Sequence, residues 1–173
     1  RRTILRSETG DDNLGPGIAA VSHSPPTPSP GVPVTVRARV ADADGVASVR
    51  VFYKKDSAEV SDFESVELFP DTDRGMGAYA GEIPPLADET VRVVFYIEAV
   101  DVADNFRRFP AMAPGRLLVY LTEGPVEESL QLLFTEKNWT ELQTRHVHSN
   151  VLVDGVFVVG NELIHYGVGV RYR

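Results

Sequence analysis

The stretch VTVRARVADADGVASVRVFYKK, residues 34–55, decides the fold. Small apolar side chains alternate with threonine and arginine over residues 34–40, the period of a β-strand with one buried face. The segment ADADG, residues 41–45, interrupts the alternation with residues that favour tight turns. The alternation returns over residues 48–55, with Val49, Val51 and Tyr53 on one side. The stretch therefore predicts two strands joined by a short turn.

The same pattern recurs along the chain at spacings near ten residues. Further strands are predicted at GIAAVS (17–22), SVELF (65–69), AYAGEI (78–83), VRVVFYIEAV (91–100) and RLLVYLT (116–122). The longest of them places Val91, Val93, Phe95, Ile97 and Ala99 on one face. No helical period is sustained between these segments. The sequence therefore predicts a mainly β fold, a seven-stranded antiparallel β-sandwich of the immunoglobulin or fibronectin type III kind.

Turn-rich and proline-rich segments indicate where this sandwich begins. Residues 1–15 lead into DDNLGPG and read as an N-terminal linker. Five of the twelve prolines lie within residues 25–33, which suits an edge segment or an extended connection but not a central strand. We expect the sandwich to span residues 16–123.

Residues 124–173 follow a different pattern. TEKNWTELQT (135–144) predicts a short helix with Thr135 as its N-cap. Residues 149–173 are β-rich, with a hairpin turn at Gly160-Asn161 and a bulge at Gly167. Because this segment is too small to bury a core alone, we expect an incomplete α+β segment. The chain also starts without Met and stops on an alternating GVGVRYR, so we expect a piece of a longer protein.

The C-terminal segment resembles the start of the CotH kinase family, the atypical protein kinases named after spore coat protein H. Three features carry the resemblance: the Asn138-Trp139 pair after a strand, the VDG strand at 153–155, and the VGVRYR strand at 168–173. In that family the metal-binding and catalytic carboxylates lie well downstream of the last strand. The resemblance therefore implies that ATP and Mg²⁺ serve only a full-length parent, whose catalytic residues lie beyond Arg173, and that this chain is not itself an enzyme.

The upstream sandwich resembles the immunoglobulin-like modules that precede such kinases in large secreted bacterial proteins. PPTPSPGVPVTVRARVADADGVASVRVFYK and VVFYIEAVDVADN carry this likeness. The resemblance implies an extracellular or cell-surface location, with the neighbouring domains of the parent chain as partners and a surface glycan or protein as a further one.

Composition excludes several classes of function. Asp and Glu outnumber Lys and Arg by 25 to 17, and no basic run occurs, so neither nucleic acid nor an anionic membrane is an expected partner. The apolar runs are far shorter than the ~20 residues of a membrane span, so no membrane insertion is expected. Cysteine is absent, which excludes thiol catalysis and Cys-ligated zinc.

Two acidic turns are the candidate metal site. In immunoglobulin strand order, DADG (42–45) and DVADN (101–105) lie in loops at the same end of the sandwich. Their oxygen ligands suit Ca²⁺: Asp42, Asp44, Asp101, Asp104 and Asn105. The alternative interpretation is that these residues only form tight turns. No cofactor is otherwise required.

Two further patterns are candidate sites. HVH (146–148) with His165 is a candidate metal set, and a loop of solvated histidines is the alternative. Exposed aromatic residues such as Tyr96 and Phe106 are candidates for a carbohydrate platform, although Tyr96 also suits the outer face of its sheet. Three functions remain: a non-catalytic spacer or binding module, part of an atypical kinase, and a carbohydrate- or surface-binding adhesin.

Overall fold

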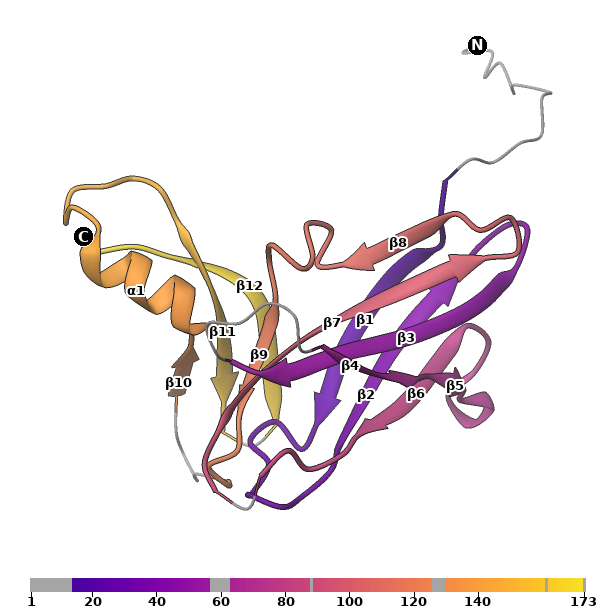
Figure 1. Ribbon diagram of the computed structural model, residues 1–173, viewed down its shortest axis with the longest axis horizontal. Helices are drawn as coiled ribbons and strands as arrows, with labels where there is room; N and C mark the ends of the chain where they lie inside the picture. Colours follow the sequence, from indigo (N-terminus) through magenta and orange to yellow (C-terminus); the bar gives the residue numbers. More distant parts are fainter. Residues whose placement is uncertain (1–13, 57–62, 88, 126–129, 161, 173) are drawn as a thin grey trace, which may run out of the picture.

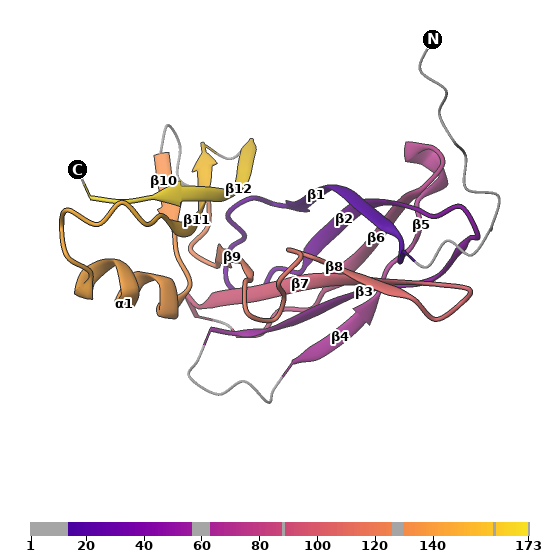
Figure 2. The same cartoon turned by 90° about the horizontal axis from the view of Figure 1, so that it is seen from above.

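The computed structural model describes residues 14–56, 63–87, 89–125, 130–160 and 162–172 (Figure 1). The fold is mainly β, and every strand pair in it is antiparallel. Two sheets pack as a sandwich, and a third, smaller sheet with one helix lies beside them (Figure 2). The predicted mainly β, antiparallel class is confirmed. Nearly all of the predicted linker 1–15, and Asn161 of the predicted turn, lie outside the described residues.

The strands of the sandwich divide between two sheets. The first sheet has the order β1 (Gly17–Ser24), β2 (Val34–Ala41), β6 (Ala78–Ile83), β5 (Phe69–Pro70). The second has the order β4 (Glu64–Glu67), β3 (Val46–Lys55), β7 (Arg92–Asp101), β8 (Phe106–Phe109), and β9 (Leu118–Leu121) also pairs with β7. A short 3₁₀ helix, η1 (Thr72–Arg74), lies between β5 and β6.

The core lies between these two sheets and uses the faces that the alternation predicts. Each predicted inward residue of β2 and β3 is at most 3% exposed, as are those of β7 from Val93 to Ala99. These side chains form one cluster with Leu68, Ile83, Leu118 and Tyr120. Burial of this apolar surface is the main force that holds the two sheets together.

Two details of the sandwich differ from the prediction. The segment SVELF, predicted as one strand, divides at Leu68: β4 pairs with β3, whereas β5 pairs with β6 in the other sheet. The chain crosses between the sheets at this residue, which is only 2% exposed. In addition, the residues FRRF form β8, a strand that the sequence analysis did not predict. The described sandwich therefore has nine strand segments, β1 to β9, rather than seven.

Residues 130–172, called the C-terminal unit below, contain β10 (Leu130–Leu133), α1 (Glu136–Thr144), β11 (Val153–Val159) and β12 (Leu163–Val170). The sheet order is β10-β11-β12. The predicted N-cap is confirmed, because the Thr135 hydroxyl accepts a hydrogen bond from the Asn138 backbone N–H. The predicted bulge is also confirmed: the β11–β12 register shifts at Gly167, whose φ of 67° suits glycine. β12 ends at Val170, short of the predicted strand end.

Candidate functional site

The two acidic turns meet at one end of the sandwich, as predicted. The turn between β2 and β3 touches the turn between β7 and β8 through a hydrogen bond from the Val102 N–H to the Gly45 carbonyl, 3.2 Å long. Asp42 and Asp44 lie on the first turn, and Asp101, Asp104 and Asn105 lie on the second. The two turns are therefore adjacent, as the calcium hypothesis assumes.

The carboxylates of Asp42 and Asp101 accept hydrogen bonds from within their own turns. Asp101 is 1% exposed, and its Oδ1 accepts hydrogen bonds of 2.8 Å from the N–H groups of Ala103 and Asn105. Its Oδ2 accepts one of 2.9 Å from the Asn105 side chain. Oδ1 of Asp42 likewise accepts from the Asp44 N–H at 2.9 Å. These are the bonds of Asp residues that stabilise tight turns.

The environment of Asp101 favours its charged form. Desolvation raises the pKa of this carboxyl, but the hydrogen bonds from Asn105 and Ala103 outweigh it and hold the pKa below its ordinary value of 3.8. Within the described ranges, no group of three or more His, Cys, Asp or Glu side chains is arranged to hold a metal ion. The hydrogen bonds support the turn interpretation, and the calcium site stays a prediction.

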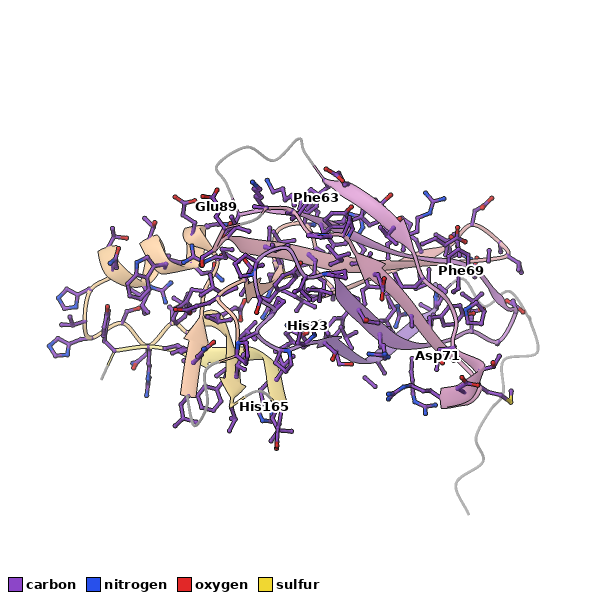
Figure 3. All side chains as sticks on the ribbon, turned by 90° about the horizontal axis from the view of Figure 1, so that it is seen from below. His23, Phe63, Phe69, Asp71, Glu89 and His165 are labelled. Atoms are coloured by element: carbon purple, nitrogen blue, oxygen red, sulfur yellow. The ribbon has the colours of Figure 1, made fainter. Side chains whose placement is uncertain are left out.

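The three histidines of the candidate metal set are not arranged as a group that could hold a metal ion. His146 and His148 are exposed in the loop after α1, with ring centroids 5.4 Å apart. His165 lies on β12, on the face of the C-terminal sheet turned away from the sandwich, where its ring stacks on Phe157 at 6.5 Å (Figure 3). Asp71, between β5 and η1, lies at the far end of the sandwich from the C-terminal unit (Figure 3), and its carboxylate lies 3.9 Å from the Arg37 guanidinium.

The aromatic residues proposed for a carbohydrate platform separate into one covered and one open ring. Tyr96 is only 6% exposed, because Phe52 stacks on it at 4.9 Å and Arg108 lies over its ring at 5.6 Å. Phe106 is 59% exposed, with Arg108 5.1 Å from its ring centre. Tyr96 therefore covers the outer face of its sheet, the alternative that the sequence analysis named.

The C-terminal unit packs against the second sheet of the sandwich. Val94 of β7 and Val119 of β9 project from the outer face of that sheet and are at most 1% exposed. They share an apolar cluster with Val156 and Val158 of β11, which are at most 2% exposed. The outer face of β7 therefore meets β11 at Val94, while Val93 and Phe95 on either side of it face the core.

Polar contacts border this apolar interface. Arg116, in the loop before β9, forms an ion pair with Asp154 of β11 at 2.5 Å. Asp56, just after β3, accepts a 2.6 Å hydrogen bond from the Glu136 N–H in the first turn of α1. A carboxylate in this place satisfies a free N–H and complements the positive end of the helix. Burial raises the pKa of Asp56, which the contacts with Glu136 N–H and Arg92 partly oppose.

A histidine joins the first sheet to the C-terminal unit. His23 of β1 is 3% exposed, and its Nε2 donates a 3.0 Å hydrogen bond to the Pro26 carbonyl. Its Nδ1 accepts a hydrogen bond from the Tyr166 hydroxyl of β12. Burial lowers the pKa of His23 to about 4, against the opposing effect of the Pro26 bond, so the ring is neutral at neutral pH. Figure 3 shows His23 near the middle of the molecule, beside the C-terminal sheet.

Two clefts open along the junction. One of about 760 Å³ lies between β1, the segment from β8 to β9, and the C-terminal strands β11 and β12. The other, of about 640 Å³, lies between the end of β3 and the start of α1. Both are lined by Arg116, Leu117, Thr135, Asn138 and Asp154. The Arg116–Asp154 ion pair thus lies where the two clefts meet, and each residue neutralises the charge of the other.

Sequence reasoning missed the residues of this junction. His23 lies at the edge of the proline-rich segment, and its partner Tyr166 is 143 positions away. The one available signal was the unbroken apolar run of β7, which is typical of a strand buried on both faces. None of the candidate sites proposed from the sequence lies at this junction.

Comparison with known proteins gives no assignment: no family model matches the chain, and no curated protein matches it. Among the described residues, no helix is both long and apolar enough to cross a membrane.

Proposed function

We propose that the chain is a non-catalytic immunoglobulin-like module of a larger secreted or cell-surface protein, and that the C-terminal unit is the first part of a CotH kinase-like domain. The module acts as a fixed platform for that unit and as a spacer for the parent protein. Catalysis, with its ATP and Mg²⁺, belongs in this proposal to residues beyond Arg173.

The strand order supports the immunoglobulin-like part of the proposal. In constant-type immunoglobulin domains, strands A, B, E and D form one sheet and C, F and G form the other. Chain order makes β1, β2, β6 and β5 the equivalents of A, B, E and D. The second sheet then corresponds to C and F with G divided into β8 and β9, and β4 is an additional edge strand beside C.

The observation that carries the platform function is the buried interface between the sandwich and the C-terminal unit. The unit has only three short strands and one helix, and its inward side chains are covered by the sandwich as well as by each other. Apolar contacts with β7 and β9, two charged contacts and the His23–Tyr166 bond hold it in one orientation. In this proposal the module therefore holds the C-terminal unit in a fixed position for the following part of the parent protein.

Two experiments test the proposal. Incubation of the full chain with labelled ATP, Mg²⁺ or Mn²⁺ and a generic protein substrate should give no transfer above a buffer control. Transfer that rises with the concentration of the chain would contradict the non-catalytic assignment.

The platform role is tested by dividing the chain. Residues 1–125 should fold alone, but they should bind a dye for exposed apolar surface, because Val94 and Val119 lose their cover. A peptide of residues 126–173 should suppress that dye binding when it is added. If the dye signal does not depend on the peptide, the sandwich is not a platform for it.

A further inference from the structure

His23 occupies a closed aromatic site between the two parts of the molecule. The centres of three rings lie within 6 Å of its own: Tyr120 at 5.2 Å, and Phe95 and Tyr166 at 5.9 Å. Phe95 and Tyr120 belong to the sandwich, whereas Tyr166 belongs to the C-terminal unit. Both ring nitrogens are used, since Nε2 donates to Pro26 and Nδ1 accepts from the Tyr166 hydroxyl.

This arrangement favours the neutral imidazole. The titratable groups that face the ring are the phenols of Tyr166 from β12 and Tyr120 from β9, and burial raises the pKa of both, so neither supplies a negative charge. The contacts described for the ring from β7 and from the Pro26 loop include no carboxylate. A proton added at Nδ1 would turn this nitrogen into a donor to the Tyr166 oxygen, and it would place an uncompensated charge in an apolar site.

We propose that His23 is an acid-sensitive latch: its protonation releases the C-terminal unit from the sandwich, while the sandwich itself stays folded. Tyr166 packs against the inter-sheet core but is not one of its buried members, and β1 is an edge strand, so the sandwich loses contacts only at its margin. The C-terminal unit, in contrast, covers the ring with Tyr166, so its release lets water reach the charged imidazole. The latch does not rest on the proposed function, since it requires only the docked arrangement.

The direction and size of the effect follow from linkage. The pKa of His23 falls from an ordinary 6.5 to about 4 in the docked state, so the docked state binds fewer protons between these values. Docking is therefore fully stable above pH 6.5 and weakens as the pH falls towards 4. With an ordinary imidazole in the released state, the equilibrium constant for release rises about 20-fold between pH 7 and pH 5.

The only tryptophan of the chain reports this release. Trp139 of α1 lines a small cavity together with Val119 and Leu121 of β9, so its surroundings change when the unit leaves. The experiment records tryptophan emission and amide hydrogen exchange of the full chain between pH 7 and pH 5, with exchange rates corrected for the intrinsic effect of pH. We expect a red shift and about 20-fold faster exchange in β11 and β12 at pH 5, with β2 and β7 unchanged.

Variants separate the latch from other acid effects. His23→Gln stays neutral and should remove the pH dependence, whereas His165→Gln, on the exposed face of β12, should leave it as in the wild type. If His23→Gln does not fold, Tyr166→Phe serves instead: it should increase release at pH 7 while the protein remains pH-dependent. The proposal is overturned if wild-type release is equal at pH 7 and pH 5. It is also overturned if His23→Gln keeps the full pH dependence, which would assign the effect to a different group, or if β2 and β7 lose protection together with β12.

Discussion

Replacement of Val158 by alanine should weaken the docking of the C-terminal unit without unfolding the sandwich. Val158 is 0% exposed and lies in the cluster with Val94 and Val119. The change removes two buried methyl groups at about 0.8 kcal/mol each, and the cavity left behind adds to this loss, so docking should weaken by about 2 kcal/mol. That free energy corresponds to roughly 30-fold more frequent release.

Hydrogen exchange of individual amides measures this effect. Amides of β11 and β12 should exchange roughly 30-fold faster in Val158→Ala, while those of β2 and β7 keep their protection. Val159→Ala is the matched control, because the neighbouring side chain points to the opposite, partly open face and should cost under about 1 kcal/mol. The reasoning is refuted if β2 and β7 lose as much protection as β11, or if the two variants behave alike.

Two further predictions concern the sandwich. Gly81→Ala should destabilise it by about 1–3 kcal/mol in denaturant unfolding, because the new Cβ would lie 2.7 Å from the Glu67 carbonyl oxygen where the chain crosses between sheets. Gly17→Ala is the comparison, because its new Cβ would make only an ordinary contact, 3.6 Å from the Ala41 carbonyl oxygen, and equal costs would contradict the clash. Melting temperatures in EDTA and in millimolar Ca²⁺ should be the same, because Asp101 already uses both carboxylate oxygens within its turn; a rise with Ca²⁺ that Asp101→Asn abolishes would instead establish the calcium site.

The parts of the fold that depend on local pattern could be predicted from the sequence. Alternation identified the inward faces of β2, β3 and β7, because a strand with one buried face repeats every two residues. The cap at Thr135 and the bulge at Gly167 followed from the chemistry of single residues. The meeting of the two acidic turns followed from strand order, although their hydrogen bonds favour turn formation over metal binding.

The missed features depend on contacts between distant segments. The alternation in SVELF runs without a break through Leu68, so nothing local marks the change of sheet there. β8 contains two consecutive arginines, Arg107 and Arg108, so it lacks the alternation of a strand with one buried face. It lies at the edge of its sheet, where charged side chains can reach water. The His23–Tyr166 bond joins residues that only the docked C-terminal unit brings together, and no periodicity within either segment records it.

The most direct test of the account is whether the C-terminal unit is docked on the outer face of the second sheet in solution. Nuclear Overhauser contacts between methyl groups, measured on the full chain at neutral pH, decide this. The account predicts contacts that join Val119 of β9 to the valines of β11, Val156 and Val158, since all three belong to one buried cluster. Strong contacts within each part, with none between Val119 and β11, would show that the sandwich does not hold the unit and would contradict both the platform and the latch.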